Sequence, residues 1–211
     1  MRIFGIDPGS GRTGYGCVEA DGRTARLVTC GAISAHAGDA FPQRLARIHR
    51  ELSALLAGCG PDCVAIESLF HAVNARTALK LGHARGVAML AAVEFGCPVV
   101  EYTPAAIKRA VVGYGRAEKH QVQQMIKLLL GLDHPPSPHD AADALAVAMC
   151  HLYSMPPADL APHRAGVRGG GPAKGRLYDA GVKLRGKTAV EADRQDRLPK
   201  SWRQYRPPTN G

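Results

Sequence analysis

Two acidic residues in this sequence stand at the ends of apolar runs, where a charge needs a reason. Asp7 follows Ile3-Phe4-Gly5-Ile6 and is followed by a Gly-containing loop, and Glu67 follows the apolar run 63–66. An Asp before Pro8 also initiates turns, and a Glu at a strand end is commonly a solvated edge residue. Because both acids repeat one pattern, apolar strand then carboxylate, we interpret them as candidate site residues.

A second acidic pair lies near residue 140. Asp140 and Asp143 are three residues apart, so on a helix they share one face. Ser137 is predicted to cap this helix and Pro138 to be its first residue, in which case Asp140 could serve only the cap and the helix dipole. Asp143 lies one turn deeper among alanines, where a charge is costly unless something pairs with it.

Four carboxylates that converge would repel one another unless divalent cations neutralised them. Oxygen ligands favour Mg²⁺ or Mn²⁺ over zinc. Two such ions about 4 Å apart suit phosphodiester hydrolysis, since one activates a water and the other stabilises the leaving oxygen. His139 could add a ligand or carry a proton, although it points about 100° away from Asp140 on a helix.

Two lysines could bind a phosphate beside such a site. Lys108 and Lys119 lie in segments predicted to be helical, with Lys119 in the run Arg116-Ala117-Glu118-Lys119-His120. An ammonium group close to the metal ions would hold the scissile phosphate. The alternative is that both are solvated lysines on helix surfaces.

The elements that must position these residues follow from hydrophobic periodicity. Strands are predicted near 2–6, 14–20, 25–34, 62–67 and 98–102, and helices near 41–57, 74–95, 104–111, 118–131 and 138–153. The first three strands are joined by short turns and are expected to form an antiparallel meander. This order predicts an α/β fold with a mixed five-stranded sheet flanked by helices, in which strand 62–67 lies beside strand 2–6.

The helix predicted over 74–95 has a face of very small residues. Ala78, Gly82 and Gly86 recur every four residues, so another backbone could approach closely. Packing against the sheet is the favoured interpretation. The alternative is the seam of a symmetric dimer.

The charge distribution divides the chain of 211 residues into two parts. The net charge of +9 and the pI near 9.5 favour a polyanionic partner, nucleic acid before a membrane surface. Residues 1–154 hold 15 Lys and Arg against 13 Asp and Glu, whereas residues 155–211 hold 12 against 5 together with 7 Pro and 8 Gly. We therefore predict a catalytic domain over 1–154 and a disordered basic tail over 155–211, which is either a solvated extension or an arm for a phosphate backbone.

Targeting signals and cysteine usage suggest the compartment. No signal peptide and no apolar stretch of membrane-spanning length is visible, so no membrane partner is expected. The six cysteines lie mostly in apolar segments without the paired spacing of a zinc site. We interpret them as reduced core thiols and expect a cytoplasmic protein.

Several blocks of this sequence together resemble one known family. They are Ile6-Asp7-Pro8-Gly9-Ser10 with Thr13-Gly14-Tyr15-Gly16, Ile66-Glu67 through Phe70, and the runs 78–87, 111–119 and 140–146. These blocks span about residues 1–153 and resemble the RuvC crossover junction endodeoxyribonucleases, the Holliday junction resolvases. The tail has no counterpart in that resemblance, so it inherits nothing from it.

The resemblance implies a ribonuclease H-like fold and a homodimer that makes paired symmetric nicks in like strands of four-way DNA junctions. It implies Mg²⁺ dependence, with Mn²⁺ able to substitute, and 5′-phosphate and 3′-hydroxyl ends. The family's metal-binding acids fall on Asp7, Glu67, Asp140 and Asp143, although some relatives have a His at the place of Asp140. RuvA and RuvB, the branch-migration proteins, are implied partners.

The resemblance also implies residues that contact DNA. Its base-contacting aromatic falls on Phe70 and its phosphate-contacting lysines on Lys108 and Lys119, and Lys119 is counted with the catalytic residues. Polar residues after Phe70 complete the predicted DNA surface, namely Asn74, Arg76 and Lys80.

Three other functions remain as alternatives. Actin-like ATPases and sugar kinases also place an Asp-x-Gly loop after a strand, but they need a second phosphate loop, and none is evident after Asp143. A non-catalytic junction-binding protein would not need all four acids. An RNA-processing nuclease of the same fold is the nearest rival, and comparing junction DNA with structured RNA as substrates would separate the two.

Overall fold

The computed structural model describes residues 1–36, 38–68 and 74–156. Phe70 and the predicted tail from residue 157 onward lie outside this described part. Ten helices and strands follow one another in it, in the predicted order: β1 (Arg2–Asp7), β2 (Arg12–Asp21), β3 (Thr24–Ser34), α1 (Phe41–Cys59), β4 (Cys63–Glu67), α2 (Ala75–Phe95), β5 (Val99–Tyr102), α3 (Pro104–Val112), α4 (Lys119–Leu129) and α5 (His139–Ser154). No helix in these ranges is both long and apolar enough to cross a membrane.

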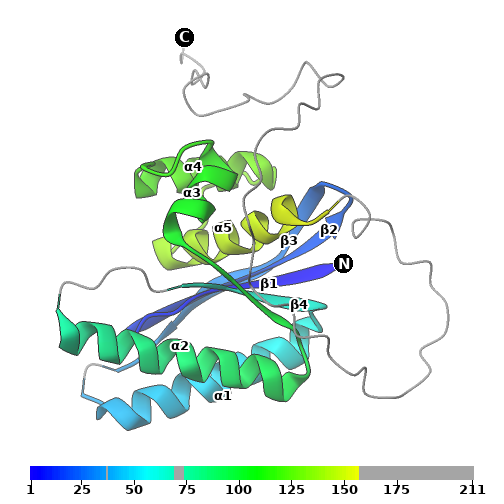
Figure 1. The fold of residues 1–211 in the computed structure, drawn as a ribbon. Coiled ribbons are helices and arrows are strands. Elements are labelled where there is room, and N and C mark those ends of the chain that lie inside the picture. The colour runs from blue at the N-terminus through cyan, green and yellow to red at the C-terminus, as the bar shows by residue number, and fades with distance from the viewer. Residues whose placement is uncertain (37, 69–73, 157–211) are drawn as a thin grey trace, which may run out of the picture.

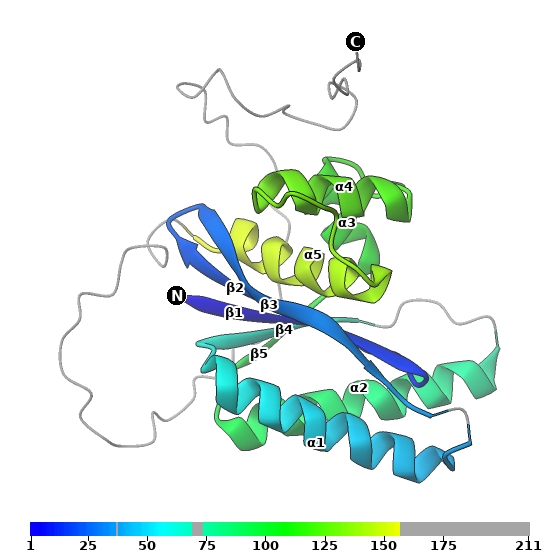
Figure 2. The same cartoon turned by 180° about the vertical axis from the view of Figure 1, so that it is seen from behind.

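The strands form one mixed sheet in the order β3-β2-β1-β4-β5. Strand β2 pairs antiparallel with both β1 and β3, which confirms the meander, and β1–β4 and β4–β5 are parallel. Helices α1 and α2 cover one face of the sheet and α3, α4 and α5 cover the other (Figure 1; Figure 2 shows the reverse side). The prediction of a mixed five-stranded sheet between helices is therefore confirmed.

Side chains of β1 point alternately into two hydrophobic cores, one on each face of the sheet. Phe4 and Ile6 are fully buried in the core shared with α1 and α2, whereas Ile3 is buried in the core beneath α5. Successive side chains of a strand point to opposite faces. Asp7, next after Ile6, therefore faces α5.

Helix α5 lies almost in backbone contact with β1 and β2. A Cβ atom added to Gly5 would lie 2.1 Å from the carbonyl oxygen of Ala144, and one added to Gly14 would lie 2.0 Å from that of Asp140. Glycine is required at both places because any side chain would push the helix away from the sheet. Gly14 is also the register partner of Asp7, so the first turn of α5 lies beside the end of β1.

The favoured interpretation of the small-residue stripe in α2 is wrong. The side of α2 that is buried carries Ala84, Ala88, Ala91 and Ala92. Added Cβ atoms at Gly82 and Gly86 would have no atom within 4 Å, and Ala78 is exposed. Alanines fill the space beneath the helix, which leaves the glycine face directed away from the sheet.

Candidate active site

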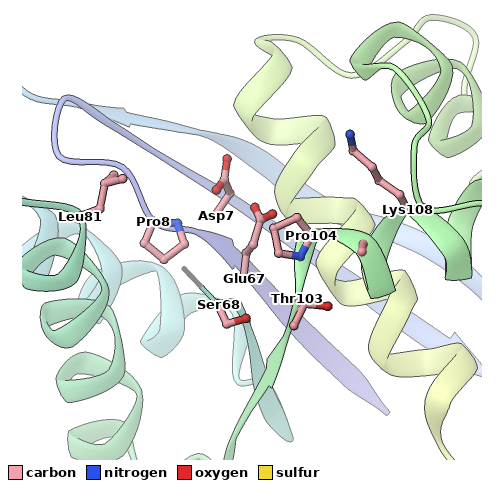
Figure 3. Close-up of a pocket in the computed structure, with 10 residues that line it drawn as sticks. Asp7, Pro8, Glu67, Ser68, Leu81, Thr103, Pro104 and Lys108 are labelled. Atoms are coloured by element: carbon pink, nitrogen blue, oxygen red, sulfur yellow. The ribbon is translucent and has the colours of Figure 1, made fainter. Parts of the chain in front are cut away.

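The centre of the site is a pair of carboxylates from neighbouring parallel strands. Asp7 ends β1 and Glu67 ends β4, and Ile6 and Ile66, the residues before them, are register partners. Both acids therefore leave the same sheet edge on the α5 face. Their side chains share a hydrogen bond and point toward one another (Figure 3).

Burial dominates the electrostatics of this pair. It raises the pKa of Glu67 to about 8, with a further contribution from the nearby Asp7 carboxylate and from the hydrogen bond to it. Burial also raises the pKa of Asp7, whereas the hydrogen bond from Glu67 opposes that rise. Burial and mutual proximity thus both disfavour the simultaneous ionisation of the two carboxyl groups.

The two acids of α5 lie within electrostatic range of Asp7, and each is paired with a cation. Lys119 Nζ lies 3.2 Å from Asp143 Oδ2, and Arg12 Nη1 lies 3.3 Å from Asp140 Oδ2. The Asp143 carboxylate raises the pKa of Lys119. The structure thus gathers all four predicted acids and Lys119 in one region, and it adds Arg12, which sequence reasoning missed.

The predicted cap of α5 is wrong. The helix begins at His139, with Pro138 in extended conformation before it and no side chain capping the end. Ser137 is therefore one residue too early to cap the helix. Asp140 lies in the first turn, but its structural partner is Arg12, so the capping explanation does not account for it.

Lys119 is the first residue of α4 and is held in place by the turn before it. Gln121 Oε1 accepts hydrogen bonds from the backbone N–H of Glu118, at 2.9 Å, and from the Tyr114 hydroxyl, at 2.7 Å. Sequence reasoning missed Gln121, although Glu118-x-x-Gln121 has the spacing of a capping box and could have indicated it.

A cavity of about 520 Å³ opens beside the acid pair. Asp7, Glu67 and Lys108 line it, so Lys108 lies at the same cavity as the carboxylates, as Figure 3 shows. Its other walls are mostly apolar or carry small hydroxyl groups: Pro8, Ser68, Leu81, Thr103, Pro104, Ala105 and Gly115. Such walls supply little solvation to a charged carboxylate, consistent with the raised pKa of Glu67.

The remaining predicted residues lie at the surface around the start of α2 and α5. Asn74 caps α2, since its side chain accepts a hydrogen bond of 2.9 Å from Thr77 N–H. The Lys80 ammonium lies 5.9 Å from the centre of the Phe41 ring, within the range of a cation–π contact. Arg76 and His139 are exposed. These positions assign a contact within the protein to Asn74 and Lys80. DNA contact stays a prediction for Asn74, Arg76 and Lys80, and metal binding or proton transfer stays one for His139.

The chemistry of the donor set fits a divalent cation. In the described ranges, no three His, Cys, Asp or Glu side chains stand close enough together to hold an ion. In this arrangement the acids of α5 pair with Lys119 and Arg12, and Glu67 is hydrogen-bonded to Asp7. Four carboxylates supply only oxygen ligands, which are those that Mg²⁺ and Mn²⁺ prefer.

The sheet order, the helices on both faces and the acids at the ends of β1, β4 and the start of α5 define a ribonuclease H-like protein of the nuclease class. Residues 3–151 match the family described as crossover junction endodeoxyribonuclease RuvC. The chain belongs to this family. Its function is accordingly that of a Holliday junction resolvase, an endonuclease of DNA recombination and repair, as the sequence predicted.

Individual relatives agree with this assignment. The RuvC endonuclease of Koribacter versatilis is 54% identical over 156 residues, covering 73% of this chain and 93% of the relative. That of Chloroflexus aggregans is 51% identical over 156 residues, covering 74% and 95%. The structure of Thermus thermophilus RuvC in complex with a Holliday junction substrate superposes with a TM-score of 0.69 at 36% identity, covering 72% of this chain and 93% of that one.

Proposed function

We propose that Asp7, Glu67, Asp140 and Asp143 bind two Mg²⁺ ions, for which Mn²⁺ substitutes, and that this centre cleaves the junction. The observation that carries the proposal is the buried, hydrogen-bonded pair of Asp7 and Glu67 at the ends of neighbouring parallel strands, with the two acids of α5 in electrostatic range. Buried carboxylates that face one another stay ionised only when a cation compensates them. Such ions, when bound, supply the Lewis acidity that activates a water and stabilises the departing 3′ oxygen, giving 5′-phosphate and 3′-hydroxyl ends.

The protein's own groups would orient the DNA strand in this centre. Lys119, next to Asp143, and Lys108, on the wall of the cavity, are the proposed ligands of the scissile phosphate. Phe70, Asn74, Arg76 and Lys80 are the proposed contacts to the junction beyond it. The apolar walls at Leu81 and Pro104 would exclude water from the carboxylate pair.

The decisive experiment replaces Asp7 by Asn. We expect Asp7→Asn to bind a synthetic four-way junction normally and to lose at least about 100-fold in cleavage rate with Mg²⁺, because electrostatic stabilisation of that size depends on the acid. Asp62→Asn is the matched control, since Asp62 lies at the opposite end of β4 and accepts a hydrogen bond from Arg2 N–H at 2.7 Å. Cleavage by Asp7→Asn at the rate of the control would refute the proposed centre.

A homodimer is part of the same proposal, and we assign it to the exposed face of α2. Leu79, Leu90 and Val93 are 64%, 51% and 64% exposed, and they lie with Gly82 and Gly86 on one stripe opposite the buried alanines. A second copy of the same stripe fits this surface, because the glycines allow two helices to approach closely and a two-fold axis pairs like with like. Two active sites related by that axis would suit two nicks in like strands.

Sedimentation velocity tests the dimer surface. Leu90→Asp with Val93→Asp should convert the dimer to a monomer and lose paired nicking, because two charges would be buried at each copy of the seam. Val28→Asp is the control, since Val28 is 38% exposed on β3 and lies outside the stripe. A dimer that survives the double substitution would place the interface elsewhere.

RuvA and RuvB as partners, and the cytoplasm as location, complete the proposal. The support for the two partners is family membership alone. For the location, the support is the DNA substrate together with six free thiols, of which five are buried.

A further inference from the structure

Arg12 is a cation of the acid cluster that the assignments above leave without a function. It is the first residue of β2, and its guanidinium lies 3.3 Å from an Asp140 oxygen across 128 residues of sequence. The proposed phosphate ligands Lys108 and Lys119 come from α3 and α4 instead. Arg12 therefore adds a positive charge to the cluster from a different element, beside the β1–β2 loop.

The backbone at Arg12 is fixed by the fully buried residue after it. The Thr13 hydroxyl donates a hydrogen bond of 2.8 Å to the carbonyl oxygen of Gly9. Gly9 in turn packs so closely on the carbonyl of Arg12 that an added Cβ atom would lie 2.0 Å from it. The loop that follows Asp7 thus holds Arg12 at a defined place over the first turn of α5.

The side chain at this place retains free capacity for a ligand. The Arg12 side chain is 53% exposed, and the contact that the described residues make to it engages Nη1 alone. Arg26 gives the contrast, because both its Nε and its Nη2 donate to Glu19. A guanidinium carries five N–H donors in a fork that matches a phosphate. A surface ion pair with one contact contributes little stability. The pair with Asp140 alone therefore does not explain why an arginine occupies this position.

We propose that Arg12 binds a backbone phosphate of the DNA strand that enters the acid cluster, from the β2 side of the site. The inference rests on the proposed function, since it takes the acid cluster as the place where the strand lies. It makes Arg12 a substrate-binding residue in addition to a partner of Asp140. A non-bridging phosphate oxygen would accept from the Nε and Nη2 donors that Asp140 does not use.

The dependence of junction binding on salt tests this directly, in EDTA so that no cleavage occurs. The slope of log affinity against log salt falls by about 0.9 for each phosphate contact that is lost. We expect Arg12→Gln to lower the slope by about that amount, so that between 50 and 200 mM salt it loses about 3.5-fold less affinity than the wild type. Arg26→Gln removes an equally charged surface arginine on β3 and should leave the slope unchanged.

Two further variants make the result decisive. Arg12→Lys keeps the charge and should keep the slope, and Arg12→Gln should lower the slope equally in the background of Asp140→Asn. An unchanged slope in Arg12→Gln, or a change that disappears when Asp140 is neutralised, overturns the proposal and leaves Arg12 as a partner of Asp140 only. A loss of slope in Arg12→Lys as large as in Arg12→Gln also overturns it. Because these measurements need no cleavage, they stand apart from the Asp7→Asn test.

Discussion

The distance between α5 and the sheet determines how far the acids of α5 lie from Asp7. A substitution at Gly14 tests this dependence. An alanine at this position would put its Cβ atom 2.0 Å from the carbonyl oxygen of Asp140, whereas real Cβ atoms do not come closer than 3.0 Å. The two backbones must therefore separate by at least 1.0 Å. Gly14 is the register partner of Asp7, so a displacement of α5 away from β2 also moves the acids of α5 relative to Asp7.

A misplacement of about 1 Å at a catalytic centre costs about 100-fold in rate. Overpacking of this kind costs about 1–3 kcal/mol of stability, which is less than the total of a typical domain, so the protein should remain folded. We therefore expect Gly14→Ala to cleave a synthetic four-way junction about 100-fold more slowly in a single-turnover assay at saturating protein. Thermal unfolding, measured in parallel, separates the local displacement from global loss of structure.

Gly11→Ala is the matched control, in the β1–β2 loop three residues before Gly14. An added Cβ atom at Gly11 would have no neighbour within 4 Å. We expect this variant to cleave within about 2-fold of the wild type, because surface substitutions of this kind change stability by less than about 0.5 kcal/mol. If Gly14→Ala cleaves as fast as Gly11→Ala, the contact of α5 with β2 does not position the acids, and the reasoning is refuted.

Three further predictions concern Glu67, Gln121 and the tail. Because the folded-state pKa of Glu67 is raised from 4.5 to about 8, the stability that its protonation provides is complete below pH 4.5 and is lost as the pH rises toward 8. In EDTA, thermal unfolding should therefore show Glu67→Gln to be more stable than the wild type at pH 8.5 and equal to it at pH 4.5; equal stability at both would contradict the raised pKa. Gln121→Ala should slow junction cleavage by about 10-fold through Lys119 without changing the unfolding temperature by more than about 4 °C, and an unchanged rate would show that Lys119 needs no such support. Removal of residues 157–211 should lower the salt slope of junction binding if the tail is a phosphate arm, and an unchanged slope would leave it a solvated extension.

Strand order and the positions of Asp7 and Glu67 could be predicted because each depends on local patterns. An apolar run that ends in an acid fixes where the carboxylate emerges, and short turns fix the meander. The contact between Arg12 and Asp140 could not be predicted in this way, since it joins residues 128 positions apart and depends on how far α5 lies along β2. The residue pattern indicated the four acids and the resemblance agreed with them, but neither gave any indication of Arg12.

The prediction of which face of α2 packs against the sheet was wrong for a different physical reason. Small residues occur on both of its sides, so the sequence has little contrast between a buried and an exposed face. Ala84 and Ala88 are buried and Gly82 and Gly86 are not, although either pair could pack closely. The exposed Leu90 and Val93 were the better signal, because large apolar side chains on a helix face need a partner to cover them.

The charge balance of the site explains how a nearly neutral domain could select DNA. Three cations lie beside the four carboxyl groups, namely Arg12, Lys108 and Lys119, and their positive charge offsets most of the acidic charge of the cluster. Two divalent ions bound as proposed would leave this balanced cluster strongly positive, and a phosphate strand would restore the balance. Metal and DNA should therefore each bind more tightly in the presence of the other, by the same factor in both directions. The affinity for a non-cleavable junction should then rise with Mg²⁺ in the wild type and much less in Glu67→Gln, although bulk screening by the salt acts equally on both proteins.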